Sequence, residues 1–275
     1  MSKALARQHA KAIRGLLDAE RRGLARMLTA VRDALTRATG PLSSARNMSE
    51  AIMAARVAAS DIERSLRLAI AESRADARMI SATGFKAQLD EVSKALGLSI
   101  PKPMRATRPI DDVAAHTAAS SYGTAWLGDA TARLSIANRT GQPNASRAAE
   151  EATKAQSHRV ERIATTEVAT AFNDEQRELA TEAAAGSPVW SSVTFRRWDA
   201  RLDAKVCSVC AEHDGEEVPL DASFKGDAEP GAVHPRCRCV ATIVTFPDRL
   251  AIVERQEARR REWVNPKTGK PMRAP

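Results

Sequence analysis

The residues best suited to carry chemistry are four cysteines and one histidine in a single short window. The window opens with Cys207-x2-Cys210 and, after a polar loop, closes with His234-x2-Cys237 and Cys239. A tetrahedral zinc ion takes four thiolate or imidazole ligands, and tight C-x2-C and H-x2-C turns present such ligands at the required spacing. Backbone amides inside such a turn can also point at the sulfur atoms. The window therefore predicts a structural zinc site.

Five candidate ligands are available for four positions around the ion. We predict Cys207, Cys210, His234 and Cys237 as the ligands and keep Cys239 as the alternative. Cys237 and Cys239 are two positions apart, so on a strand their side chains share a face and either thiol could reach the metal. A disulfide or a set of buried thiols would also explain the cysteines. The sequence shows no signal peptide, so we expect a reducing cytoplasm, which disfavours disulfides.

The composition favours helices and allows more than one domain. A chain of 275 residues has room for two domains, or for one domain with a long extension. Abundant alanine, together with leucine, arginine and glutamate, makes a helix-prone mixture. The formal net charge of +8 suits contact with nucleic acid or another anionic surface, although a solvated surface produces the same balance. No apolar run approaches the ~18 residues needed to cross a bilayer, so we expect no membrane partner.

Apolar residues in the first hundred positions recur at intervals of three, four and seven, which is the pattern of amphipathic helices. We predict helices over 2–39, 47–80 and 86–96. Gly40-Pro41 should end the first helix, and Asn47 or Ser49 should cap the second. Because large apolar side chains are few, each helix alone would be marginal and should pack on its neighbours or on partner subunits.

Prolines alternate with basic residues after these helices, which predicts an extended linker. A further helix is expected from Asp111 or Asp112 to about Asn138, with Val113 and Trp126 among its larger apolar residues. A turn over 140–144 then leads into the last long helix. We predict five segments: an N-terminal helical region 1–97, a Pro-rich basic linker 98–109, a helical connector 110–145, a C-terminal module with the zinc site 146–247, and a basic tail 248–275.

The C-terminal module is expected to combine one long helix with short strands. On the helix predicted over 146–185, Arg162, Thr166 and Asn173 form a polar stripe beside Glu167. The stripe is either a solvated face, or Arg162 and Glu167 tie the helix to the metal module through buried hydrogen bonds. Beyond this helix the apolar period changes to alternation, which predicts a strand ending near Trp198. A second strand is predicted over 239–246, because this stretch is rich in Val, Thr and Ile. The predicted fold class is predominantly α, with a small α+β C-terminal module of a long helix and short antiparallel strands around a Cys/His metal loop.

Several elements of this module occur in the order found in one known family. They are Arg162-x3-Thr166-Glu167, Trp198-Asp199, Cys207-x2-Cys210, Asp214-Gly215 and His234-Pro235-x-Cys237-Arg238-Cys239. In these elements the chain resembles the phage head morphogenesis family, typified by the F protein of phage Mu. The resemblance covers roughly residues 146–247, and the His-Pro-x-Cys-Arg-Cys ending is its most specific part.

The resemblance implies a minor capsid protein of a tailed phage. Such a protein lies inside the head near the portal, after a stage of procapsid assembly in the host cytoplasm. Its implied partners are the portal protein, the major capsid or scaffold protein and phage DNA, and it acts in assembly and in DNA packaging or ejection. Members of the family do not all carry the cysteine pair, so the resemblance implies that a zinc ion stabilises the module rather than performing its function.

Two other function classes account for part of the pattern. In a zinc-dependent HNH-like nuclease, His213-Asp214 could orient a water, but such an enzyme needs an open coordination position on its metal. A closed site with several thiolates is typical of a structural ion instead. A zinc-ribbon DNA-binding regulator would need a recognition helix beside the metal loop, and the sequence offers none. We therefore predict no catalytic residues and rank the nuclease second and the regulator third.

The tail is the most cationic stretch of the chain, and we expect it to be partly disordered. Its arginines are candidates for phosphate contacts with DNA, which would depend steeply on salt and little on base sequence. The alternative is that these charges only keep an extended arm solvated. The candidates are Arg255, Arg259, Arg260 and Arg261.

Overall fold

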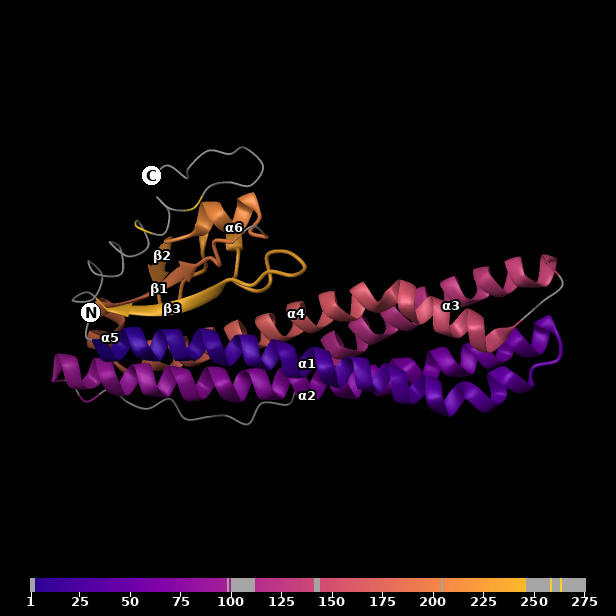
Figure 1. The fold of residues 1–275 in the computed structure, drawn as a ribbon. Coiled ribbons are helices and arrows are strands. Elements are labelled where there is room, and N and C mark those ends of the chain that lie inside the picture. The colour runs from indigo at the N-terminus through magenta and orange to yellow at the C-terminus, as the bar shows by residue number, and fades with distance from the viewer. Residues whose placement is uncertain are drawn as a thin grey trace. The chain divides into compact units, whose positions relative to one another are not determined.

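Long helices make up most of the fold, and a small antiparallel sheet follows them (Figure 1). This computed structural model describes residues 3–97, 99, 112–140, 144–203, 205–245, 258 and 263. The elements are α1 (Lys3–Ser44), α2 (Met48–Leu96), α3 (Asp112–Arg139), α4 (Ala145–Gly186), α5 (Pro188–Val193), β1 (Thr194–Asp199), α6 (Ser208–His213), β2 (Glu217–Pro219), the 3-10 helix η1 (Lys225–Asp227) and β3 (Val240–Thr245). The predicted fold class is therefore confirmed. Among the described helices, none is both long enough and apolar enough to cross a bilayer.

The described residues form two compact units that share three of the long helices. The sheet unit contains the described residues of 1–18, 76–107 and 168–275. The helical unit contains the described residues of 19–75 and 108–167. The segments predicted from sequence follow the chain from end to end, whereas each unit combines pieces of α1, α2 and α4. The predicted linker, apart from residue 99, and the tail, apart from residues 258 and 263, lie outside the described residues.

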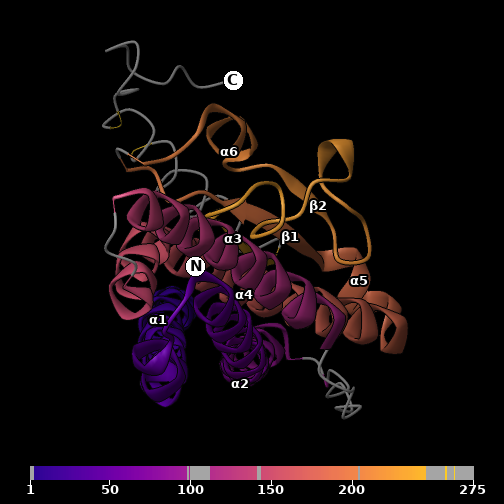
Figure 2. The same cartoon turned by 90° about the vertical axis from the view of Figure 1, so that its right-hand side faces the viewer.

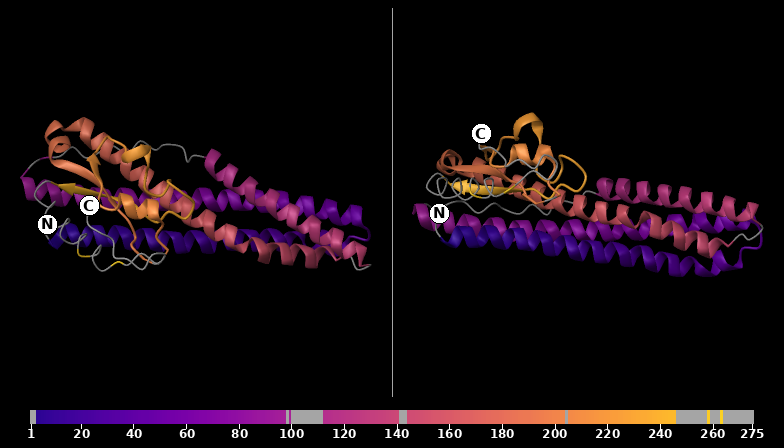
Figure 3. Two further views of the ribbon diagram at one scale, coloured as in Figure 1. Left: turned by 90° about the horizontal axis from the view of Figure 1, so that it is seen from above. Right: turned by 45° about the horizontal axis from the view of Figure 1, so that its top comes forward.

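In the helical unit α1 and α2 run antiparallel, because Arg26 bonds to Ser73 and Arg37 bonds to Ser65 (Figure 3). The first helix does not end at Gly40-Pro41 as predicted, but continues to Ser44. Proline removes one helical hydrogen bond, yet Leu42 in the following turn is 4% exposed and packs into the core. Burial of this side chain thus extends the helix past the proline.

The second helix is longer than predicted and is continuous. A break between 80 and 86 was expected, but α2 runs from Met48 to Leu96 without interruption. Ser81 and Phe85 in this stretch are both buried, and Ser81 Oγ donates to the carbonyl oxygen of Phe172 on α4. Tertiary contacts therefore hold a segment whose sequence pattern is weak. At its start, Asn47 Oδ1 accepts from the amide of Glu50, which confirms Asn47 as the cap.

The core of the helical unit is built largely from alanine, with a few large side chains that fill the remaining space. Tyr122, Trp126 and Leu134 of α3 are fully buried, and the Trp126 indole donates to Thr153 Oγ1 of α4 at 2.9 Å. Val113, another of the larger apolar residues of this helix, is 74% exposed. Small alanine side chains let the helices approach closely, so few large residues suffice to close the core.

The sheet has the order β2-β1-β3, with both neighbours antiparallel to the central strand β1. The strands predicted to end near Trp198 and to run over 239–246 correspond to β1 and β3. The edge strand β2 and the short helix α5, capped by Ser187, were not predicted. Within β1 the charged Arg196 is fully buried, whereas the apolar Phe195 is only half-buried. The helix α6 lies over one face of the sheet (Figures 1 and 2).

Candidate metal centre

The four predicted ligands and the alternative, Cys239, all gather in one cluster beside the sheet. One group consists of Cys207, Cys210 and His234, and a second consists of Cys210, Cys237 and Cys239. Within each group the candidate ligand atoms lie within 4.8 Å of one another. Cys210 belongs to both groups, so it is the centre of the cluster.

Two turns of the chain aim the sulfur atoms. Cys207 is the N-cap of α6, and its Sγ accepts the amide hydrogen of Cys210 at 3.3 Å. On the opposite loop, the amide of Gly231 donates to Cys237 Sγ, also at 3.3 Å. Amide donors stabilise sulfur in its thiolate form, which is the form that binds a metal ion. The expected amide–sulfur contacts of the C-x2-C turn are therefore present.

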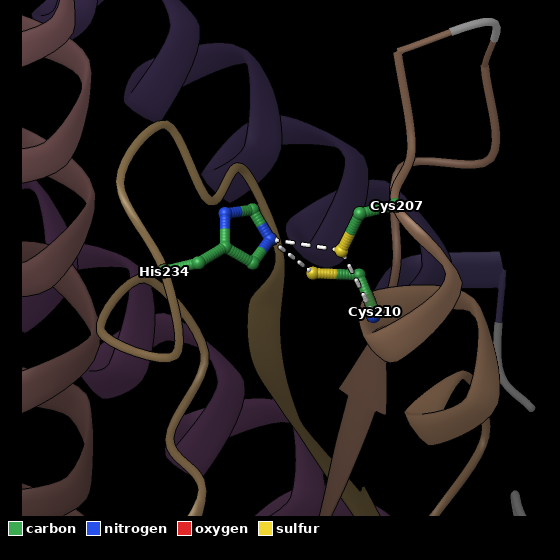
Figure 4. A group of neighbouring side chains, drawn as sticks. All are labelled: Cys207, Cys210 and His234. Atoms are coloured by element: carbon green, nitrogen blue, oxygen red, sulfur yellow. Dashed lines mark hydrogen bonds between the residues drawn. The ribbon is translucent and has the colours of Figure 1, made fainter.

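His234 is oriented to offer one ring nitrogen as a ligand. Its Nδ1 lies 2.8 Å from the carbonyl oxygen of Pro235, which can only accept a hydrogen bond. The proton therefore resides on Nδ1, and the lone pair on Nε2 is free for coordination. Nε2 points at the sulfurs of Cys207 and Cys210, at 3.1 and 2.9 Å (Figure 4). A backbone contact that fixes the tautomer in this way is common among metal-binding histidines.

The spacing between sulfur atoms fits metal binding and not a disulfide. All four cysteines are free, and Sγ of Cys210 lies 3.7 Å from Sγ of Cys237. A disulfide would need about 2.05 Å between the sulfurs. Two thiolates on one tetrahedral zinc, with bonds of about 2.3 Å, lie about 3.8 Å apart. The two nitrogen–sulfur distances are somewhat shorter than the corresponding edge of about 3.5 Å.

The charge state within the cluster is uneven. Hydrogen bonds from Cys210 and Cys239 lower the pKa of Cys237 well below the ordinary range of a thiol. The hydrogen bond to Cys237 is the main cause that raises the pKa of Cys210, and burial adds to it. Several thiols this close together cannot all ionise without a cation among them, because buried like charges repel. A divalent cation would remove this conflict.

The cluster is attached to α4 by Asn173 and Thr170. Asn173 Nδ2 donates to the carbonyl oxygen of Cys239 at 3.1 Å, and its Oδ1 accepts from the amide of Ala241 at 3.0 Å. Thr170 Oγ1 donates to the carbonyl oxygen of Gly231. Asn173 thus pairs with the start of β3 as a neighbouring strand would. Buried amides of this kind are satisfied by such contacts, which makes the attachment specific.

Thr170 and Asn173 therefore make the connection between the helix and the metal loops that was considered for Arg162 and Glu167. They lie one to three turns further along α4. The Glu167 carboxylate forms an ion pair with Arg74 of α2 at 2.6 Å, inside the helical unit. Arg162 and Thr166 are half-buried on α4. Of the predicted polar stripe, Asn173 is the member that reaches the metal loops. The helical spacing identified the correct face, but only the packing shows which position meets the loop.

The remaining residues of the sequence motif surround the cluster. Trp198 is fully buried, stacks on His213 at 4.6 Å and meets the edge of the Phe224 ring. Asp214 is 1% exposed and accepts from the amide of Ala200, and the amide of Gly215 donates to the carbonyl oxygen of Trp198. These contacts fix α6 against β1, so they hold the C-x2-C turn in place.

Three further motif residues lie in or beside the second metal turn. Arg238 makes two hydrogen bonds of 2.7 Å to the Asp203 carboxylate, and this contact lowers the pKa of Asp203. Asp199 is buried at the end of β1, opposite Val240, and Pro235 is exposed beside the histidine. The arginines predicted to contact DNA, Arg255, Arg259, Arg260 and Arg261, lie outside the described residues.

One important contact was missed by sequence reasoning. Arg196, at the centre of β1, forms an ion pair with Glu229 at 2.5 Å and donates to the carbonyl oxygen of Ala222 at 3.1 Å. Its guanidinium also lies over the Phe224 ring. Glu229 stands shortly before His234, so this pair anchors the loop that carries the histidine. The partners are 33 positions apart, and no local pattern links them.

Comparisons of the chain with protein-family models, with curated proteins and with solved structures found no match.

Proposed function

We propose that the cluster is a structural zinc site held by Cys207, Cys210, His234 and Cys237, with Cys239 as the alternative fourth ligand. Three kinds of observation support this choice of ion. The donor set of thiolates and one imidazole is the set that zinc prefers in structural sites. The spacing of 3.7 Å between the Cys210 and Cys237 sulfurs and the fixed histidine tautomer suit tetrahedral coordination. An ion there would join α6 to the loop before β3 and thus cross-link the sheet unit.

We further propose that the chain is a minor capsid protein that acts in head morphogenesis of a tailed phage. The observation that carries this proposal is the convergence of the motif residues. Trp198, Asp214, Gly215, His234 and Arg238 are spread over 41 positions of sequence, yet each contacts the sheet or the metal loops. A set of residues that forms one physical module is more informative than the same residues scattered over a surface.

The arrangement of His213 and Asp214 favours this structural role over a nuclease. His213 Nδ1 lies 2.5 Å from Glu216 Oε2 while its ring stacks on Trp198. Asp214 is buried and bonded to the backbone of Ala200. Both side chains are thus engaged in holding the module together. A general base in a nuclease would have to face a water and a phosphodiester.

The partners of such a protein would be the portal, the major capsid or scaffold protein, and the packaged DNA. If the chain is a minor capsid protein, purified procapsids and virions should contain it in few copies relative to the major capsid protein. Quantitative mass spectrometry of both particles measures this ratio. Particles that assemble fully in its absence and never contain it would overturn the proposal.

A separate measurement tests the enzymatic alternative. The purified protein is incubated with linear and plasmid DNA in the presence of magnesium, manganese or zinc, and we expect no cleavage. His213→Ala serves as the matched variant. Cleavage by the native chain that is lost in this variant would promote the nuclease instead.

A further inference from the structure

We propose that a groove between α1 and α2 in the sheet unit binds an acidic amphipathic helix of another protein. The groove has a volume of about 510 Å³, and the described residues that line it belong to these two helices. It is distant in sequence from the cysteine window and shares no residue with the metal centre. The inference is independent of the metal and of the proposed role in head assembly.

The shape of the groove follows from close helix packing at a glycine. A Cβ added to Gly15 would lie 2.7 Å from Ile80 Cγ2, so the two helices approach there as only glycine allows. The lining positions on α2 are Met79, Ile80, Thr83, Gly84 and Ala87. They span nine residues, or about 12 Å along a helix axis, which is a little over two turns. A shallow furrow of this length between two helices fits the side of a third helix.

The lining provides an apolar floor with a cationic rim. Met79 is 52% exposed, and methionine adapts its shape to apolar partners. On the α1 side Lys11 and Arg14 are exposed, and among the described residues neither makes an ion pair. With Asp18 the lining carries two cations and one anion. A partner with apolar residues one turn apart and flanking carboxylates would complement both features.

The polar groups in the groove do not form a site for a small polar ligand. The Thr83 hydroxyl donates to the carbonyl oxygen of Met79 on its own helix, at 2.8 Å. This hydroxyl proton is therefore not available to a ligand in the groove. The remaining polar side chains, Lys11, Arg14 and Asp18, are exposed at the rim. Small-molecule sites instead hold a few fixed polar groups at depth. Apolar contact along the groove and charge at its rim therefore define the occupant.

The test uses yeast display of random 16-residue peptides selected on the full-length protein. We expect enriched sequences to carry apolar residues at helical spacing and an excess of Asp and Glu. Lys11→Glu/Arg14→Glu should weaken their binding by roughly tenfold, because repulsion replaces attraction at the rim, and binding should weaken with salt. Thr83→Trp, which fills the furrow, should abolish it. Arg56→Glu, at an exposed arginine elsewhere on α2, should have no effect.

Three outcomes would overturn the proposal. Enriched peptides without acidic excess, or peptides that bind the double variant as well as the native chain, would show that charge does not select the partner. Failure to enrich any helical peptide would show that the groove is not a docking site. Sedimentation equilibrium adds the last outcome: a dimer of the native chain that dissociates in Thr83→Trp would identify a second copy as the occupant. Melting curves of each variant check that the fold is retained.

Discussion

The metal centre depends on a few side chains whose neighbours fix their chemistry. The Pro235 carbonyl fixes the tautomer of His234. The amide of Cys210 donates to the sulfur of Cys207, and the amide of Gly231 donates to the sulfur of Cys237. Each of these contacts involves backbone, so a substitution that preserves the fold preserves the orientation. The cluster holds one more candidate ligand than a tetrahedral ion needs, because Cys237 and Cys239 both lie beside Cys210.

The shared position of Cys210 leads to a prediction for the ligand set. The native chain should purify with about one zinc per chain, and Cys210→Ser should lose it, because both groups of ligands need this thiolate. Cys237→Ser should retain zinc with weaker affinity, because Cys239 can replace the lost ligand. Cys239→Ser should change the affinity much less, while the double variant should lose zinc. Elemental analysis and titration with a competing chelator measure both quantities. A metal-free native chain with an unchanged melting temperature would contradict the assignment.

Gly231 offers a second prediction at the residue scale. Its φ of +86° is in the left-handed region, and an added Cβ would lie 2.8 Å from backbone atoms of Ala169 on α4. Gly231→Ala should lower the free energy of unfolding by about 3 kcal/mol or more, since backbone strain and steric overlap act together.

Gly226 is the matched control for this substitution. It also has a positive φ, of +69°, but a Cβ there would meet nothing within 4 Å. Gly226→Ala should therefore cost only about 1 kcal/mol from backbone strain. Urea denaturation of both variants measures the difference. Equal losses would mean that the approach of the loop to α4 is not tight.

Among the elements, the central strand β1 decides how the module is assembled. Five of its six residues are buried, and it pairs with β3 over all six residues and with β2 over Phe195 to Arg197. Arg196 and Arg197 are buried within it, and each forms an ion pair, with Glu229 and Glu217 respectively. Charges inside a small sheet are costly unless paired, so these two contacts specify how the neighbouring loop and edge strand attach.

Removal of one partner should show this cost. Glu229→Gln leaves the guanidinium of Arg196 buried without its counter-ion, and we expect a loss of about 3–5 kcal/mol in unfolding free energy. Glu151→Gln is the control, because Glu151 also bonds to two arginines but is exposed to solvent. Its substitution should have a much smaller effect, since water screens the pair. Similar losses for the two variants would refute the role of the buried pair.

At the scale of the whole molecule, the two compact units differ in what stabilises them. The helical unit is held by packed alanines and by Tyr122 and Trp126, whereas the core of the sheet unit includes the cysteine cluster. A small core of this kind commonly needs a metal ion to remain folded. The consequence is that the units should respond differently to metal removal.

Hydrogen exchange can resolve this difference along the chain. Treatment with a strong chelator should remove protection from amides of β1, β2 and β3, because the loops that join them lose their cross-link. Amides of Ala115 to Leu134 in α3 should remain protected. Restoration of zinc should return protection to the strands, while magnesium should not. Equal loss of protection in both units would contradict a local role of the ion.

The cationic tail is the subject of the last prediction. Deletion of residues 248–275 should preserve folding and the proposed association with the portal but remove most binding to DNA at low salt, because lysine and arginine contacts to phosphate release counterions. Fluorescence anisotropy at several salt concentrations measures the affinity. Unchanged affinity would show that the tail is not the contact. Loss of portal association instead would mark the tail as a docking segment.

Much of this architecture follows from local signals in the sequence. Helical spacing of apolar residues predicted α1, α3 and α4 within a few residues of their ends, and the two cysteine turns predicted the cluster. These features are local, because a helix repeats every 3.6 residues and a C-x2-C turn closes within four. Alternation also located β1, and a high content of Val, Thr and Ile, residues that favour strands, located β3.

Features that depend on contacts between residues far apart in the chain were determined only by the tertiary structure. The burial of Leu42 extends α1 beyond Pro41. The hydrogen bond from Ser81 to Phe172 stabilises the part of α2 at which the apolar pattern had predicted a break. The strand β2 has only three residues and exists because β1 offers it backbone partners. From its residue type Arg196 would be expected at the surface. It is buried instead, because Glu229, 33 positions away, forms an ion pair with it. In each case a free energy set by distant neighbours outweighs the local preference, and a single sequence carries no record of which neighbours meet.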